Sequence, residues 1–78
     1  MTVANRKYDE LKTKVRPRLN KILASKRMVQ RDLEKRSGVT QASISRFDKS
    51  SRFEIAHLIA IKEALGLNSI DELFEIEA

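Results

Sequence analysis

The chain has 78 residues, of which 41% are hydrophobic and 35% charged. The hydrophobic fraction is sufficient for one small packed core. The chain is too short for a second domain. Cysteine is absent, which excludes disulfide scaffolds and thiolate zinc sites and favours an intracellular location. No apolar run approaches the roughly 18 residues of a membrane span, and the segment Met1 to Lys12 lacks the apolar core of a signal peptide. We therefore expect a soluble cytoplasmic protein.

The net charge of +5 is distributed unevenly along the chain. Residues 1–52 carry 15 Lys or Arg against 5 Asp or Glu, whereas residues 53–78 carry only Lys62 against 6 acidic residues. A block this basic favours phosphate or another polyanion as its partner. Taken alone, however, the charge is equally typical of a solvated surface.

The spacing of the apolar residues predicts an all-helical protein. Only two glycines and one proline occur, and apolar positions recur at three- and four-residue steps and do not alternate. Leu19, Ile22 and Leu23 form one stripe, which predicts a helix over residues 16–26. Pro17 is expected in its first turn, where a missing amide donor costs nothing.

The region before this helix is less determined. Leu11 and Val15 extend the same stripe, so residues 8–14 are either further helical turns or a loosely ordered arm rich in Lys and Arg. The sequence leaves both alternatives open. We accordingly divide the chain into a basic N-terminal arm or helical extension, residues 1–15, and a folded domain, residues 16–78.

Two short helices are predicted in the middle of the chain. The first covers residues 29–37 and ends at Gly38, which can adopt the left-handed conformation that closes a helix. Thr40 can cap the second helix, residues 41–48, with its hydroxyl. This second helix is expected to bury Ile44 and Phe47.

Two capping-box spacings predict the last helices. Ser51 and Glu54 precede an apolar set that ends before Gly66. Ser69 and Glu72 repeat the spacing and predict a short acidic helix that ends near Glu77. The fold class is therefore all-α, a compact five-helix domain.

Two short helices joined by a glycine-containing turn within a basic domain are typical of a helix-turn-helix DNA reader. The sequence VQRDLEKRSGVTQASISRFDK, residues 29–49, resembles the phage-repressor, or Cro and Xre, helix-turn-helix family. The similarity continues through IKEALGLNSIDELFE and covers roughly residues 16–76. The matching residues are Gln30, Leu33, Gly38, Val39, Ile44, Ser45 and Phe47. The resemblance implies a lambda-repressor-like domain that binds double-stranded DNA through the helices over 29–37 and 41–48.

The same resemblance implies the roles of individual residues. The residues expected to face base edges are Gln41, Ala42, Ser45 and Arg46. A glutamine amide can both donate to and accept from adenine, an arginine can grip guanine, and an alanine can touch a thymine methyl. The residues expected to contact the DNA backbone are Gln30, Thr40, Ser43, Lys49 and Arg52.

Several positions depart from the family pattern. Val29 stands where Thr is usual and cannot cap the following helix, at a cost of about 1 kcal/mol. Glu34 occupies a position that is normally small, and it can turn outward or pair with Arg31. Ser37 replaces a buried apolar residue, and Ser50, Ser51 and Arg52 replace glycine and proline. These changes motivate an alternative, a protein-binding adaptor such as an antirepressor, an antitoxin or a modulator of another regulator.

A single recognition helix makes few contacts, so related readers pair two half-sites by dimerising. We expect a homodimer on an inverted repeat, with Leu67, Phe74 and Ile76 as interface candidates. The resemblance implies a transcriptional regulator, a repressor of phage, mobile-element or bacterial type, acting in the bacterial cytoplasm or nucleoid. A regulatory protein partner is compatible with the acidic, apolar C-terminus.

Other classes of function have little support. His57 is the only histidine, and Gly38 and Gly66 are isolated, so neither a catalytic pair nor a phosphate-cradling loop is indicated. We expect no enzyme, no cofactor and no metal. Binding of single strands without sequence preference is disfavoured because stacking platforms are few, with only four aromatic residues, Tyr8, Phe47, Phe53 and Phe74.

Overall fold

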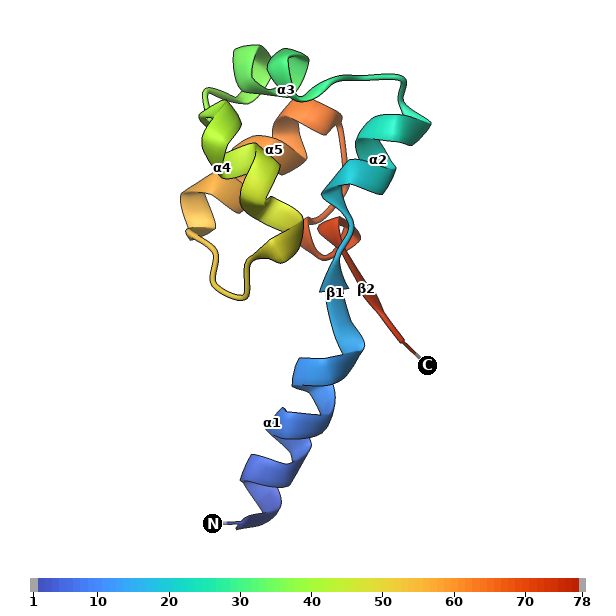
Figure 1. Cartoon of the computed structure of the whole chain (residues 1–78), viewed down its shortest axis with the longest axis vertical. Coiled ribbons are helices and arrows are strands. Elements are labelled where there is room, and N and C mark those ends of the chain that lie inside the picture. Colours follow the sequence, from blue (N-terminus) through green and yellow to red (C-terminus); the bar gives the residue numbers. More distant parts are fainter. Residues whose placement is uncertain (1, 78) are drawn as a thin grey trace.

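The computed structural model describes the backbone of residues 2–77 and the side chains of residues 8–77. The α-helices and strands, in chain order, are α1 (Thr2–Lys14), β1 (Val15–Pro17), α2 (Leu19–Ser25), α3 (Gln30–Ser37), α4 (Gln41–Arg46), α5 (Ile55–Leu65) and β2 (Phe74–Ile76). Single 3-10 turns cover Phe47–Lys49 and Ile70–Leu73. Figure 1 shows α2 to α5 gathered into one body from which α1 projects. The predicted helical, lambda-repressor-like fold class is confirmed, and a two-stranded ribbon is added to it.

The core lies between α2, α3, α4 and α5, and α2, α3 and α4 bury the apolar residues that their sequence spacing predicted. In α5 the expected set of Ile55, Leu58, Ile59 and Leu65 is only half right, because Ile55 and Ile59 are exposed and Ile61 is buried with Leu58 and Leu65. The side chains with less than 2% of their surface exposed are Leu19, Leu33, Ile44, Ile61 and Leu73. Burial of one such side chain stabilises the fold by roughly 1.5–3 kcal/mol. The remaining core residues are Ile22, Leu23, Val39, Phe47, Leu58 and Leu65.

The start of the first domain helix was predicted too early. Helix α2 begins at Leu19, and Pro17 belongs to strand β1 instead of a first helical turn. Proline disfavours helical geometry in the residue that precedes it, so Arg16 is extended. β1 pairs with β2 in antiparallel register, with Val15 opposite Ile76, Arg16 opposite Glu75 and Pro17 opposite Phe74.

The prediction of a fifth helix reaching Glu77 is also wrong. The Glu72 carboxylate does accept hydrogen bonds from the amides of Asn68 (2.7 Å) and Ser69 (3.0 Å), as a capping residue should. The helix is only one 3-10 turn long, however, and the chain then enters β2. Arg18 accounts for the change, because its amide donates to the Leu73 carbonyl and its Nε donates to the Glu72 carbonyl, each at 2.9 Å.

The ends of the other helices show which local signals were read correctly. Gly38 (φ 79°) and Gly66 (φ 70°) both adopt the left-handed conformation that closes α3 and α5. The capping box expected from Ser51 and Glu54 is wrong. Helix α5 begins at Ile55 with Glu54 itself at the capping position, and Ser51 lies in the preceding loop.

The acidic C-terminal segment lies against the basic N-terminal part of the fold. Lys21 Nζ is 3.0 Å from Glu75 Oε1, and Arg16 is 3.8 Å from Glu77. These pairs are exposed and stabilise the fold little. They nevertheless give the acidic C-terminal residues a structural role, because the acidic strand β2 faces basic residues on β1 and α2.

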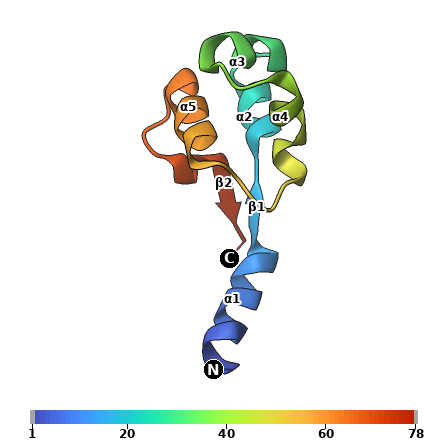
Figure 2. The ribbon, with the colours of Figure 1, turned by 90° about the vertical axis from the view of Figure 1, so that its left-hand side faces the viewer.

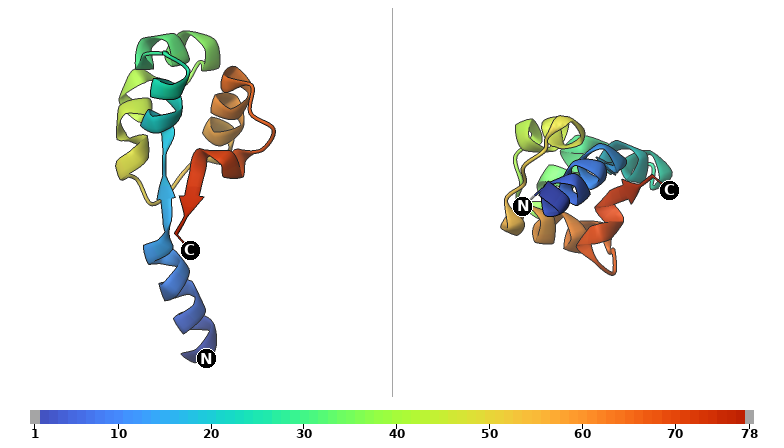
Figure 3. Two further views of the ribbon diagram at one scale, coloured as in Figure 1. Left: turned by 90° about the vertical axis from the view of Figure 1, so that its right-hand side faces the viewer. Right: turned by 90° about the horizontal axis from the view of Figure 1, so that it is seen from below.

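Helix α1 extends the molecule to 44 Å along its longest axis, against 22 and 21 Å along the others. Of the two alternatives for residues 8–14, the structure has the helix. Figures 2 and 3 show that α1 leaves the domain beyond the β1–β2 ribbon and covers none of α3, α4 or α5.

Candidate nucleic-acid interface

Helices α3 and α4 form a helix-turn-helix. They are joined by residues 38–40, and the Gly38 amide donates to the Glu34 carbonyl at 2.9 Å as α3 ends. In Figure 2, α3 lies across the top of the domain and α4 descends from it along one side. A short turn therefore presents α4 at the edge of the body, which is the arrangement that the major groove requires.

One face of α4 points into the core and the other into solvent. Ile44 and Phe47 are buried, which fixes the rotation of the helix about its axis. The four residues predicted to read bases, Gln41, Ala42, Ser45 and Arg46, are all exposed. Their spacing places them side by side on the surface of the helix.

The first turn of α4 is closed by its own side chains. The Thr40 hydroxyl accepts a hydrogen bond from the Ser43 amide at 3.3 Å, which confirms the predicted cap. Thr40 Oγ1 and Ser43 Oγ are also 3.1 Å apart and hydrogen-bonded. These two predicted backbone contacts therefore lie together at the start of the helix.

Glu34 has a role that the sequence did not reveal. Its half-buried side chain neither turns away from the junction nor pairs with Arg31; instead its Oε2 accepts a hydrogen bond from the Gln41 amide at 3.1 Å. A carboxylate is favourable at a helix N-terminus because the first amides there are unpaired. The large residue at a normally crowded position thus joins α3 to the start of α4.

The other two departures in the motif are also compensated locally. Val29 offers no side-chain acceptor, but its amide donates to Asp32 Oδ2 at 3.2 Å. The Ser37 hydroxyl donates to the Leu33 carbonyl at 2.7 Å and accepts from the Val39 amide at 3.1 Å. Both changes therefore leave the helix-turn-helix intact.

The N-terminus of α3 has amides available for an anion. Among the described residues, those of Gln30 and Arg31 have no protein acceptor, whereas the Asp32 amide bonds to the Val29 carbonyl. Gln30 is half-buried, and its Nε2 donates to Asn20 Oδ1 at 3.3 Å. Asn20 was missed in the sequence because only this contact, ten positions away, brings it to the site.

The N-terminus of α2 is instead occupied by Asp48. Its Oδ1 accepts from the Leu19 amide at 2.8 Å, and its Oδ2 accepts from the Asn20 amide at 3.0 Å. Asp48 lies in the 3-10 turn that follows α4. The carboxylate therefore fixes the end of α4 against α2, across 28 and 29 positions of sequence.

Positive charge surrounds the exposed face of α4. Arg46, Lys49 and Arg52 are all exposed, and none forms an ion pair with another described residue. Lys49 and Arg52 flank the loop that follows the recognition helix. The arrangement is suited to contacts with phosphates on either side of a groove.

The three residues predicted at a dimer interface have different environments. Phe74 is half-buried, with its ring centroid 5.9 Å from that of Phe47 and 5.3 Å from that of Phe53. Leu67 is half-buried against the core. Ile76 is 69% exposed, so it offers the most surface of the three to a partner.

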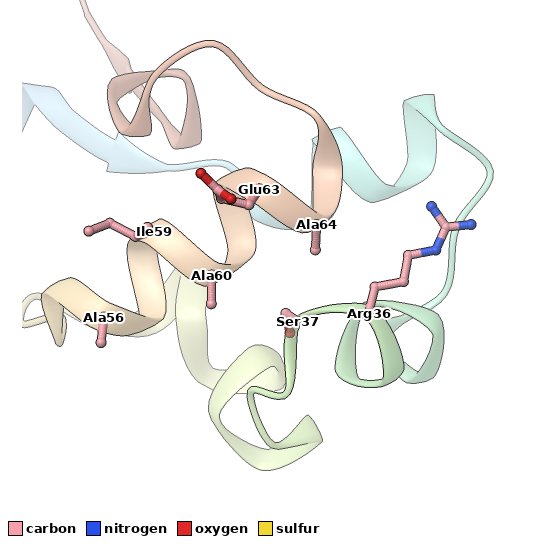
Figure 4. Close-up of a pocket in the computed structure, with 7 residues that line it drawn as sticks. All are labelled: Arg36, Ser37, Ala56, Ile59, Ala60, Glu63 and Ala64. Carbon is pink, nitrogen blue, oxygen red and sulfur yellow. The ribbon is translucent and has the colours of Figure 1, made fainter.

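A shallow groove of about 510 Å³ lies between the C-terminal end of α3 and α5. Figure 4 shows Ala56, Ala60 and Ala64 directed from α5 toward the end of α3, which carries Ser37.

Among residues 8–77, whose side chains the structure describes, no three His, Cys, Asp or Glu side chains are grouped closely enough to hold a metal ion. The described helices include none with the length and apolar character needed to cross a membrane.

Comparison with protein families agrees with this geometry. The model of the Cro/C1-type helix-turn-helix DNA-binding domain matches residues 18–78. Neither the curated proteins nor the solved structures include a match to this chain. The matched region contains α2 to α5 and every residue of the exposed α4 face. The chain belongs to the Cro/C1-type helix-turn-helix DNA-binding family, and it is a DNA-binding regulator.

Proposed function

We propose that the protein is a sequence-specific transcriptional repressor that reads duplex DNA with α4. The observation that carries the proposal is the exposed face of Gln41, Ala42, Ser45 and Arg46, held outward by the burial of Ile44 on the opposite side. These side chains combine an amide, a hydroxyl, a methyl and a guanidinium, which suit the donors, acceptors and methyl groups of the major groove.

Phosphate contacts would set the register of α4 in the groove. The open amides of Gln30 and Arg31 suit one phosphate, since the positive end of the α3 dipole lies there. Lys49 and Arg52 suit a second position beyond α4, and Thr40 and Ser43 lie at its start. Affinity would come mainly from these groups and fall steeply with salt, whereas discrimination would come from α4.

We further propose that two copies bind an inverted repeat. One α4 is 6 residues long and reaches too few bases for selective binding, and pairing half-sites one helical turn apart doubles the contacts. A dimer occupying a promoter would repress by excluding the polymerase. The setting that fits this small regulator is a phage, a mobile element or a bacterial chromosome, with action in the cytoplasm or nucleoid.

In vitro selection from a random duplex library at near-physiological salt tests the proposal. The wild type should enrich a common inverted repeat, and a Gln41→Ala, Arg46→Ala double variant should not. The matched control is Lys26→Ala, Asn68→Ala, which removes one cation and one amide at exposed positions outside the helix-turn-helix. Absence of enrichment by the wild type, or loss of enrichment in the control, would contradict base reading by α4.

The α5 groove favours one second candidate, a protein-binding adaptor on the same fold. Its alanine floor is bordered by Ile59, which is 48% exposed, and Ile55, one turn earlier, is 67% exposed. Apolar surface of this kind marks protein interaction sites. If the protein is an adaptor, it should capture a protein partner, and Ile59→Gln should abolish that capture. Its DNA binding should be weak and independent of base sequence.

A further inference from the structure

Helix α1 and the first residue of β1 carry an exposed apolar stripe. The stripe consists of Tyr8, Leu11 and Val15, which are 63%, 42% and 37% exposed. It continues onto the ribbon, because Val15 lies opposite Ile76 in the β1–β2 pair and opposite residues share a face. Ile76 is 69% exposed. We refer to these four residues as the α1 stripe.

Helix α1 has little to hold it in the monomer. All its described side chains, residues 8–14, are exposed, and the hydrogen bond from the Glu77 amide to the Lys14 carbonyl (2.8 Å) ties only its end to the ribbon. An isolated helix of 13 residues is marginally stable in water. A contact along the α1 stripe would supply the missing stabilisation.

We propose that a second copy of the chain packs its own α1 antiparallel along this stripe, about a two-fold axis near Leu11. This inference deepens the proposed dimeric regulator by assigning its interface, and rests on it to that extent. A two-fold contact is self-complementary, so the same stripe serves both copies. The stripe presents an aromatic ring and aliphatic side chains, and the one cation at its margin is Lys12, whose Nζ lies over the Tyr8 ring, 5.9 Å from its centroid.

The charges beside the stripe select the antiparallel direction. At about 100° per residue, Asp9 and Lys12 lie on one side of the stripe, and Glu10 and Lys14 lie on the other. Antiparallel packing sets Asp9 of each copy beside Lys12 of the other, and brings Glu10 toward Lys14. Parallel packing would instead set like charges together, which is unfavourable.

A hollow beside α1 gives the second helix a place to bury side chains. Its volume is about 520 Å³. Its apolar lining is Tyr8, Val15, Pro17, Phe53 and Phe74, and its polar lining is Lys12, Ser50, Ser51 and Arg52. Apolar side chains from a second α1 would fill it and cover the aromatic cluster. Arg52 belongs to the loop after α4 and is a predicted phosphate contact. Dimerisation through α1 would therefore also order this residue.

The test measures mass in the absence of DNA. Sedimentation equilibrium of the full chain should show a concentration-dependent rise from 9.0 kDa to twice that mass. Leu11→Gln should weaken dimerisation at least about tenfold, because it removes two buried leucines per dimer. Thr13→Gln, on the opposite side of α1, should not. A wild type that stays monomeric, an unaffected Leu11→Gln variant, or an equal loss in Thr13→Gln would overturn the proposal.

A charge exchange tests the antiparallel direction. Lys12→Glu should weaken the dimer, and the Asp9→Lys, Lys12→Glu double variant should restore it. Failure of the double variant to recover would overturn the antiparallel arrangement. DNA binding is then measured separately. If the wild type is monomeric and Leu11→Gln lowers its affinity for DNA, α1 is an arm that contacts DNA. That outcome would overturn the proposed interface and would leave the proposal of sequence-specific DNA binding unaffected.

Discussion

The Glu34 carboxylate accepts a hydrogen bond from the Gln41 amide at 3.1 Å, across the turn of the helix-turn-helix. Gln41 is the first residue of α4 and the leading candidate for base reading, and Glu34 lies in the middle of α3. The bond therefore joins the two helices at the point where their relative position decides whether α4 fits a groove. It also explains how the fold accommodates a long side chain at a crowded junction.

Replacing Glu34 should loosen the start of α4. Glu34→Ala removes the acceptor and is expected to lower the free energy of unfolding by about 1 kcal/mol, the usual cost of losing a helix cap. Glu34→Gln keeps an oxygen acceptor and should lose less than half of that. Urea denaturation followed by circular dichroism gives both values. An unchanged Glu34→Ala variant would show that the bond contributes nothing, and equal losses in the two variants would assign the effect to the charge of the carboxylate.

Asp48 should stabilise the fold more strongly than its surface position suggests. Its carboxylate accepts from two amides of α2, so Asp48→Ala is expected to lower the free energy of unfolding by about 1–3 kcal/mol. In a domain of this size that is a fall of roughly 4–8 °C in melting temperature per kcal/mol. Asp48→Asn, which keeps one acceptor, should lie between the wild type and Asp48→Ala in a thermal melt.

The features that sequence predicted correctly depend on neighbours in the chain. Gly38 and Gly66 end helices because of their own backbone freedom, and Thr40 caps α4 through an amide three residues away. The exposed face of α4 follows in the same way from the buried position of Ile44. A regular helix fixes the opposite face once one face is known.

The features that sequence missed depend on contacts between distant residues. The β1–β2 ribbon pairs Val15 with Ile76, and Arg18 bonds to the Leu73 carbonyl. These contacts outweighed the helical spacing at both ends of the domain. Asp48 and Asn20 likewise enter the site through partners at least ten positions away. A single sequence gives no signal for such pairings.

Gly38 should be sensitive to substitution for a backbone reason alone. An added Cβ would meet nothing within 4 Å, but the residue has φ 79°, where side chains with a Cβ are disfavoured by about 1–2 kcal/mol. Gly38→Ala is therefore expected to destabilise the fold by about 1 kcal/mol. Gly38→Asn should cost less, because asparagine tolerates the left-handed region. A greater loss for Asn than for Ala in chemical denaturation would contradict this cause.

Lys49 should contribute to affinity without contributing to specificity. If it contacts a phosphate, Lys49→Ala should weaken binding to the selected site and to random duplex by the same factor. It should also reduce the slope of log affinity against log salt by about 0.9. Fluorescence anisotropy at several salt concentrations measures the slope. Lys26→Ala, which removes a charge after α2, is the matched control, and a slope that changes equally in both variants would assign no particular contact to Lys49.

Gln41 should contribute to specificity more than to general affinity, because a base contact stabilises the complex only when the correct base is present. Gln41→Ala is expected to cost about 1–3 kcal/mol on the selected site and little on random duplex, and to relax the preference at a single base pair of each half-site. Binding titrations on the two duplexes at one salt concentration separate the effects. Equal losses on both would exclude Gln41 from base reading. If Gln41→Ala weakens binding to neither duplex, base reading would be assigned to Ser45 and Arg46, the next two exposed polar positions along α4.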